Sequence, residues 1–357
     1  MDLQRRLENY ISSPVKNKEH TCTVRMEYSL SMIKLVSSMR FIGNNQFDIS
    51  HLEDLWKKLN NIKDIGEEDS KFPIDQQGDA AELLVFTIDY FNVLFKILEK
   101  ESYLDKIPYV FTNTYGRHEL CEMGWSKAQG DHTFTYNSPY ITNCFGLTTL
   151  RTNRQGEKCS CGHMRAVQEQ IDLSTNIVLS FPPTKRGMKN PIDIQTLFNH
   201  YFKENKDMKL NCSNDNCKEQ VCIVETCKLY NFPKVLLIYL NRFCVGKEGT
   251  MTKNGRKVKI PLRELDISKH VLNHEDDQNM YKNKYDLFHV ILHGGTCDSG
   301  HYTNCHLYNG NVWHIIDDDE IMPVTDKEIM DKLRSNEPYV LLYKLRDEFV
   351  RRTNHTL

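Results

Sequence analysis

A histidine that follows a glycine-rich turn, with an aspartate sixteen residues further on, constrains the fold of this chain more than any other feature. His301 stands between Gly300 and Tyr302, and Asp317 comes shortly after Trp313. A general base and the carboxylate that orients it need this arrangement when two neighbouring strands present them. The pattern indicates the basic half of a thiol-hydrolase dyad or triad. The alternative is a structural histidine, which is the commoner role beside aromatic residues.

Alternating apolar segments flank this histidine on both sides. Residues 285–293 alternate in the way of a half-buried strand and end at a Gly-Gly turn, and residues 337–343 are typical of another strand. This order of elements resembles the C-terminal part of the ubiquitin-specific proteases, the papain-like deubiquitinases built from a thumb, fingers and a palm. The resemblance implies that His301 is the general base and that Asp317 orients it. Asp318 follows immediately, and it could assist or substitute.

A second motif precedes a helical stretch that ends near Leu98. Residues 76–84 read Gln-Gln-Gly-Asp-Ala-Ala-Glu-Leu-Leu, which is similar to the family's Gln-Gln-Asp-Ala-x-Glu-Phe-Leu motif. By this resemblance, Asp79 and Glu82 lie beside the channel for the C-terminal tail of ubiquitin, whose arginines pair with carboxylates. Tyr302 is expected to flank the same channel. On the residues alone, it is equally reasonable that Asp79 only caps the helix.

Four cysteines form two close pairs. One residue separates Cys159 from Cys161, and four residues separate Cys212 from Cys217. Two such pairs can close a tetrahedral site of four thiolates, which zinc favours. In the family that the chain resembles, these pairs lie at the tips of the fingers, which implies a structural zinc ion. His163 could replace one ligand, and the alternative is a set of reduced cysteines in a buried turn.

The family's nucleophile box has no counterpart in the sequence. That box reads Gly-x-x-Asn-x-Gly-Asn-Thr-Cys-Tyr-x-Asn-Ser; its cysteine begins a helix that lowers the pKa of the thiol, and its asparagine helps to form the oxyanion hole. The nearest string surrounds Cys22 and shares only Thr-Cys. A thiol without a helix N-terminus or an adjacent cation keeps a pKa of about 8.5 and reacts poorly. We therefore expect a thumb that is truncated at the N-terminus; either the protein has the fold without a nucleophile, or the nucleophile lies in a segment upstream of these residues.

Three functions are consistent with these motifs. The resemblance implies thiol-dependent hydrolysis of the isopeptide bond after the C-terminal Gly-Gly of ubiquitin, or of a ubiquitin-like modifier. The missing box favours a catalytically inactive relative that binds ubiquitin or acts as a scaffold. In that case the 357 residues neither hydrolyse a fluorogenic ubiquitin substrate nor react with a ubiquitin probe. A zinc-stabilised interaction module explains the cysteines but leaves the segment around His301 unexplained.

The composition agrees with an intracellular domain. The 46 basic and 48 acidic residues are interspersed, and a net charge of −2 gives no sign of nucleic-acid binding. No apolar run approaches the roughly 18 residues of a membrane span, and the N-terminus lacks the apolar core of a signal peptide. Twelve cysteines without such a signal indicate reduced thiols, some of which could hold a metal, rather than disulfides.

The order of periodic segments indicates the fold class. Helical periodicity dominates residues 26–98, and short alternating segments with turn residues follow from residue 108. We expect an α+β fold, a papain-like cysteine protease of the ubiquitin-specific type, in one domain over residues 1–350. Its expected parts are a thumb remnant with the start of the palm at about 1–145, the fingers at about 146–245, and the palm with His301 at about 246–350.

Overall fold

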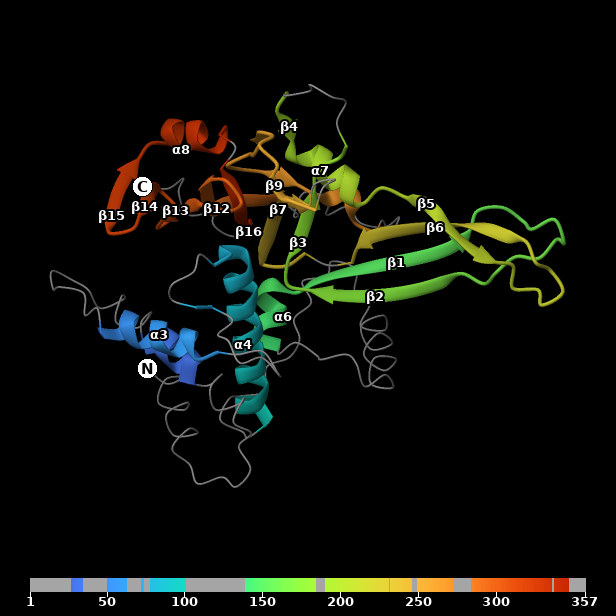
Figure 1. The fold of residues 1–357 in the computed structure, drawn as a ribbon, viewed down its shortest axis with the longest axis horizontal. Coiled ribbons are helices and arrows are strands. Elements are labelled where there is room, and N and C mark those ends of the chain that lie inside the picture. The colour runs from blue at the N-terminus through green and yellow to red at the C-terminus, as the bar shows by residue number, and fades with distance from the viewer. Residues whose placement is uncertain are drawn as a thin grey trace, which may run out of the picture. The chain divides into compact units, whose positions relative to one another are not determined.

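The alternating segments in the second half of the sequence form strands, and segments nearer its start form helices (Figure 1). This mixture confirms the predicted α+β class. The structure is a computed structural model, and the residues that it describes are 27–34, 50–62, 72–73, 78–100, 139–183, 190–230, 232–245, 249–272, 284–335 and 337–346.

The chain divides into two compact units, which are described separately. The first unit holds residues 1–109 and 136–141, and the second holds the remaining residues. The single domain over residues 1–350 stays a prediction.

Helices and a cluster of aromatic rings make up the described part of the first unit. Residues 27–34 are helical, and the longer helices are α3 (Ser50–Asn60) and α4 (Ala80–Lys100). Tyr28 is 1% exposed, and its hydroxyl forms a hydrogen bond of 2.9 Å with Thr87 Oγ1 on α4. The rings of Tyr28 and Phe86 meet edge to face, with 6.1 Å between their centroids. Such a pair adds about 0.5 to 1.5 kcal/mol beyond the burial of its area, so these contacts anchor α4 to the segment around Tyr28.

A sheet of eight strands organises the described part of the second unit, in the order β15-β14-β13-β12-β16-β7-β3 with β11 paired to β12. Adjacent strands are antiparallel except β3 and β7, which are parallel. The bounds of these strands are β3 (Ile177–Ser180), β7 (Val235–Asn241), β11 (Leu265–Asp266), β12 (Lys284–Gly295), β13 (Gly300–Tyr308), β14 (Val312–Asp317), β15 (Glu320–Val324) and β16 (Pro338–Leu345).

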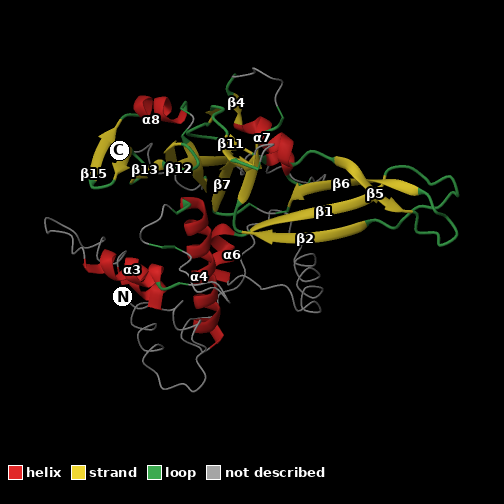
Figure 2. Ribbon diagram, in the orientation of Figure 1, coloured by secondary structure: helices red, strands yellow, loops and turns green. Residues whose placement is uncertain are grey.

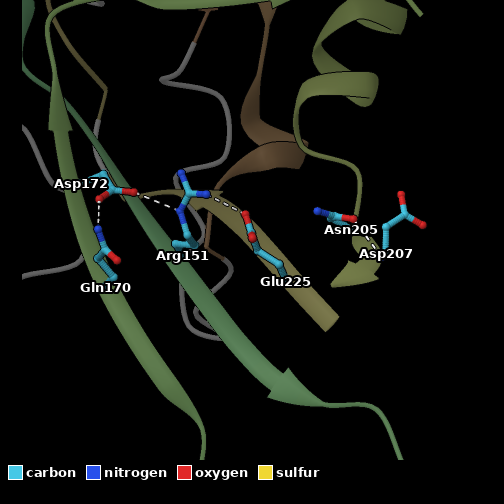
Figure 3. Close-up of polar contacts among 6 residues, drawn as sticks. All are labelled: Arg151, Gln170, Asp172, Asn205, Asp207 and Glu225. Atoms are coloured by element: carbon cyan, nitrogen blue, oxygen red, sulfur yellow. Dashed lines mark hydrogen bonds and ion pairs between the residues drawn. The ribbon is translucent and has the colours of Figure 1, made fainter. Parts of the chain in front are cut away.

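Four strands form a second sheet in the order β2-β1-β6-β5, where the fingers are expected. Arg151 ties three of these strands together (Figure 3): its Nη1 donates to Glu225 at 2.6 Å on one side, and its Nε donates to Asp172 at 3.2 Å on the other. The strands of this sheet are β1 (Leu147–Gln155), β2 (Gln168–Ser174), β5 (Asn205–Asn211) and β6 (Gln220–Leu229).

The other described elements of the chain are short. Figure 2 distinguishes the helices, in red, from the strands, in yellow. The short elements are α6 (Pro139–Phe145), α7 (Ile194–Tyr201), α8 (Asp326–Leu333), the 3₁₀ helix η1 (Ser268–His270), β4 (Ile192–Asp193), β8 (Phe243–Val245), β9 (Met251–Lys253) and β10 (Val258–Lys259).

The apolar core of the second unit joins the eight-stranded sheet to α7 and α8. Phe198 on α7 and Ile329 on α8 have no exposed surface, and Trp313 on β14 is 2% exposed. Burying a side chain of this kind contributes about 1.5 to 3 kcal/mol. A capping box between Thr325 and Glu328 fixes the start of α8. This core supports the strands that carry the predicted catalytic residues.

Membrane insertion was not expected from the sequence. Over the residues that the structure describes, no helix has both the length and the apolar character that crossing a membrane requires. The intracellular location stays a prediction.

Candidate functional site

The predicted base and acid lie side by side at the ends of two neighbouring strands. His301 is near the start of β13, and Asp317 is the last residue of β14. The His301 Nε2 atom lies 2.5 Å from the Asp317 Oδ1 atom, whereas the nearest Asp318 oxygen lies 4.0 Å away. The side chain of His301 is 54% exposed, so a substrate can reach it. Their catalytic roles stay predictions.

The turn between β14 and β15 separates the roles of the two aspartates. Asp317 pairs with Glu320 across the hairpin, which leaves Asp318 on the turn itself. Asp318 has φ 52°, in the left-handed region that aspartate tolerates better than most residues. Its side chain is 79% exposed. The hairpin therefore aims Asp317, rather than Asp318, at His301.

Two glycines bring the chain into position before His301. Gly295 has φ 98°, and a Cβ atom there would lie 2.5 Å from the backbone oxygen of Ser299. At Gly300 a Cβ atom would lie 2.2 Å from the ring of His293. Only glycine fits these positions without a shift of the backbone. The second glycine of the Gly-Gly turn and the glycine directly before His301 are therefore steric requirements for the position of His301, whereas a Cβ atom at Gly294 would meet nothing closer than 3.8 Å.

The electrostatics of the pair favour a protonated ring. The hydrogen bond that the ring donates to Asp317, assisted by the charge of Asp318, raises the pKa of His301 above its usual 6.5. Because Nε2 faces Asp317, Nδ1 is the nitrogen that remains to take a proton from a nucleophile. An imidazolium held in this way also stabilises a neighbouring thiolate. The geometry suits general acid–base work on a thiol.

Tyr302 lies in an aromatic group behind His301. Its ring centroid is 4.7 Å from that of His293 and 6.4 Å from that of Tyr339. The amine of Lys253 donates to the carbonyl oxygen of His293 at 2.6 Å and so supports the same turn. The structure thus brings Tyr302 next to the base, and its role beside a substrate channel stays a prediction.

Asp79 caps α4, as one interpretation of the sequence proposed. Its Oδ1 atom accepts hydrogen bonds from the backbone N–H of Ala81 at 2.7 Å and of Glu82 at 3.3 Å. Both acids belong to the first unit. Their predicted place beside a ubiquitin channel is not tested by this arrangement, and it stays a prediction.

The four predicted metal ligands converge at the ends of two finger hairpins. Their sulfur atoms all lie within 4.8 Å of one another. Cys159 Sγ is 3.5 Å from Cys217 Sγ, and Cys161 Sγ is 3.7 Å from Cys212 Sγ. Two sulfurs at about 2.3 Å from a tetrahedral zinc ion lie about 3.8 Å apart. The donor set therefore fits zinc, which would join the two hairpins.

The surroundings of the sulfurs shift the pKa values of the thiols in opposite directions. The backbone N–H of His163 is the main cause that lowers the pKa of Cys161 to about 7, toward the thiolate that a metal needs. Against the lowering effect of the Cys161 backbone N–H, Glu219 accepts the S–H of Cys159 at 3.2 Å, and this hydrogen bond raises the pKa of Cys159 to about 12, so metal binding must displace that proton. His163 is not among the four converging ligands, so the cysteine set is complete without it.

We expect purified protein to carry about one zinc ion per chain at these cysteines. Cys212→Ser removes one of the four sulfurs and is expected to abolish stoichiometric binding. Cys244→Ser is the matched control, because Cys244 is exposed and outside the cluster. Metal analysis of freshly prepared protein that has never met a chelator is the measurement. Protein without zinc, or a Cys212→Ser variant that keeps it, contradicts the site.

One supporting residue was missed in the sequence. Arg242 is completely buried and donates to the backbone oxygens of Pro338, Asn254 and Arg256 at 2.6, 2.9 and 2.9 Å. It thereby joins the end of β7 to the start of β16 and to the segment after β9. The only signal was a lone arginine at the end of an apolar strand, which does not reveal partners so distant in sequence.

The chain is similar to known proteins over most of its length. A family model described as ubiquitin carboxyl-terminal hydrolase matches residues 3–343. Human ubiquitin carboxyl-terminal hydrolase 21 is 28% identical over 173 residues, which are 48% of this chain and 28% of that protein. Human ubiquitin carboxyl-terminal hydrolase 2 is 29% identical over 170 residues, which are 47% of this chain and 26% of that protein. The chain thus matches little more than a quarter of the length of these relatives.

Solved structures share the fold. The Ubp8/Sgf11/Sus1/Sgf73 module of SAGA bound to ubiquitin aldehyde matches with a TM-score of 0.60 at 15% identity, over 97% of this chain and 64% of the solved chain. A second structure of that module matches with a TM-score of 0.58 at 15% identity, over 97% and 64%. At this identity the likeness concerns the fold alone, and this chain spans just under two thirds of the solved ones.

Proposed function

Because the chain belongs to the ubiquitin carboxyl-terminal hydrolase family, we propose that it is a thiol-dependent hydrolase of the isopeptide bond after the C-terminal Gly-Gly of ubiquitin or of a ubiquitin-like modifier. The observation that carries this proposal is the 2.5 Å contact between His301 Nε2 and Asp317 Oδ1 at the exposed ends of β13 and β14. A base and an orienting acid are the parts that a thiol nucleophile needs. Ubiquitin is proposed as the partner because a structure with the same fold contains ubiquitin aldehyde.

The proposed reaction assigns one task to each member of the pair. His301 Nδ1 takes the proton of the thiol, and the thiolate attacks the carbonyl carbon of the terminal glycine. The imidazolium then gives its proton to the leaving lysine amine, which leaves a thioester on the enzyme. Water, deprotonated by His301, hydrolyses the thioester and releases the carboxylate. Asp317 stabilises the imidazolium in both steps by holding its Nε2–H.

The proposal requires a nucleophile outside the described residues. Among the described cysteines none forms a hydrogen bond with His301. Cys305 follows on the same strand, but it is buried, and burial raises the pKa of its thiol to about 11. Cys22 and Cys121 are the cysteines outside the described part. The Thr-Cys string around Cys22 makes it a weak candidate.

Among the described residues no cysteine is hydrogen-bonded to His301, and this observation favours a second candidate function. A protein with this fold, a tail-binding surface and no thiol beside His301 would bind ubiquitin without cleaving it. In that case Asp79 and Glu82 still contribute to binding, while the His301–Asp317 pair has no chemical step to assist.

A ubiquitin carrying an electrophile at its C-terminus distinguishes the two candidates, with the 357-residue chain as the sample. Covalent labelling that disappears when His301 becomes alanine supports the hydrolase. Labelling that disappears in Cys22→Ala identifies the nucleophile, and Cys121→Ala is the parallel test. Calorimetric binding of ubiquitin without labelling supports the binding protein. If ubiquitin neither binds to the chain nor labels it, both candidates are contradicted.

Replacing Asp79 and Glu82 together with alanine is expected to weaken ubiquitin binding by roughly 1 to 3 kcal/mol, the scale of charge-assisted contacts. Asp79→Asn with Glu82→Gln is the sharper variant, because asparagine still caps the helix while both charges are lost. Glu53→Ala is the control, since Glu53 is an acid in the first turn of another helix, α3. Calorimetry measures the affinity. An affinity that both double variants retain shows that Asp79 only caps α4.

A further inference from the structure

Three histidines form a row across three adjacent strands of the second unit. His289 on β12 is directly opposite His306 on β13, and His306 is directly opposite His314 on β14. Opposite residues of an antiparallel pair point to the same face of the sheet, so the three imidazoles share one face. All three side chains are partly buried. Neither the family motifs nor the proposed reaction uses them.

The first two rings are already spaced as ligands of one ion. His289 Nδ1 lies 3.3 Å from His306 Nδ1. Two imidazole nitrogens at about 2.0 to 2.1 Å from a tetrahedral cation lie about 3.3 Å apart. His314, the next residue in the row, lies one strand away from His306. Among the described residues the three histidines do not form a group whose ligand atoms all lie within 4.8 Å of one another, so His314 would have to change its side-chain conformation to supply a third nitrogen.

We propose that His289 and His306 form a binding site for a late first-row divalent cation, with His314 as a third ligand. Imidazole nitrogen suits nickel, copper and zinc among such ions, and affinity for these donors is highest at that end of the series. The site is separate from the cysteine cluster, which lies at the ends of the finger hairpins.

The charge state of the rings agrees with this assignment. A metal binds the neutral imidazole. Burial is the main cause that lowers the pKa of His289 to about 4, and the charge of a protonated His306 is the second. Burial, followed by the effect of His314, lowers the pKa of His306 as well. Both shifts favour the neutral imidazole, which is the form that a metal binds.

The residues that flank the row on the two outer strands are apolar. His289 is opposite Leu342 on β16, and His314 is opposite Pro323 on β15. The cross-strand partners of the three histidines thus include no carboxylate that would compete for an imidazole and no cation that would repel a metal. The ring of His289 donates a hydrogen bond to the side chain of Asn304, the kind of outer partner that orients many metal-bound histidines.

The site would connect the strands that carry the base and acid. His306 is on β13 with His301, and His314 is on β14 with Asp317. A cation held by both strands would resist their separation, in addition to the backbone ladder between them. Its occupancy is therefore expected to raise the thermal stability of the chain through preferential binding to the folded state.

Nickel is the probe for this site, with the tag-free 357-residue chain whose cysteine cluster has first been saturated with one equivalent of zinc. Calorimetry at pH 7.5 is expected to show one nickel ion per chain and no release of zinc. His306→Ala is expected to weaken nickel binding at least tenfold, and His314→Ala by a smaller factor. His200→Ala, on helix α7, is the matched control and is expected to change nothing.

Several results would overturn the assignment. They are an absence of nickel uptake, uptake that releases zinc from the cysteines, and equal affinity in the wild type and in His306→Ala. Unchanged affinity in His314→Ala removes the third ligand. Because His289 is packed more deeply than His306, His289→Gln serves as a second variant that preserves volume. Circular dichroism checks its fold, and the rise in Tm on adding nickel must disappear in it.

Discussion

Replacing His301 with alanine is expected to lower kcat/KM for a ubiquitin conjugate by about 100- to 10,000-fold, the range that a positioned general base contributes. The ring is within 2.5 Å of Asp317 and exposed to substrate, so its loss removes the proton acceptor without opening a cavity in the core. His200→Ala is the control for the loss of a histidine elsewhere. Hydrolysis of a fluorogenic ubiquitin substrate is the measurement.

The two aspartates give this prediction a finer test. Asp317→Asn is expected to reduce turnover strongly, whereas Asp318→Asn is expected to leave most of it, because only Asp317 is within hydrogen-bond distance of His301. The NMR titration midpoint of His301 should lie above 6.5 and fall in Asp317→Asn, since the hydrogen bond to Asp317 is the main cause of the raised pKa. Full activity in His301→Ala contradicts the proposed base. A wild type that binds ubiquitin without turnover supports the second candidate instead.

The family and the fold could be predicted because their signals are local. The alternation over residues 285–293 and 337–343 corresponds to β12 and β16, and glycine is required for steric reasons at Gly295, the last residue of β12. The family match confirms the resemblance, and the solved structures confirm the predicted fold. Cysteine spacing was informative for the same reason: two short hairpin ends must each supply two ligands.

Features that depend on strand order could not be predicted. The histidine row exists only because β12, β13 and β14 pair in one register, and a slip by one residue would send a strand's side chains to the other face. The contact between Arg242 and Pro338 spans 96 residues. The choice between Asp317 and Asp318 depends on a hairpin turn that a run of three aspartates does not define. The capping of α4 by Asp79 is compatible with both interpretations of the motif, a helix cap alone and a carboxylate beside the ubiquitin channel.

Replacing Arg242 with alanine is expected to lower the free energy of unfolding of the second unit by about 3 kcal/mol or more. The buried oxygen of Pro338 loses its donor, at about 1 to 3 kcal/mol for a buried group left unpaired, and the half-buried oxygens of Asn254 and Arg256 lose a donor that water can partly replace. A cavity adds to the loss. The opposing effect is relief from burying the charge, since burial lowers the pKa of Arg242 to about 10. The lost hydrogen bonds and the cavity together cost more free energy than is gained by no longer burying one charge, so we expect a net loss of stability.

Urea unfolding, followed through the fluorescence of the buried Trp313, measures this effect. Arg263→Ala is the matched control, because Arg263 is exposed and has no ion pair within the described residues; it is expected to change stability by no more than about 0.5 kcal/mol. Arg242→Met fills the volume without restoring the donors, so it separates the cavity from the hydrogen bonds. A loss below about 1 kcal/mol in Arg242→Ala would mean that the three carbonyls find other donors.

Replacing Arg242 with alanine is also expected to change the position of His301 in the candidate active site. Arg242 holds the oxygen of Pro338, and the preceding residue, Glu337, accepts the backbone N–H of His293 at 2.8 Å. His293 in turn packs against Gly300, directly before His301. A variant that stays folded should therefore lose turnover more than it loses ubiquitin affinity, because the position of His301 depends on this chain of contacts while a binding surface elsewhere does not. Equal losses of turnover and affinity would point instead to general unfolding.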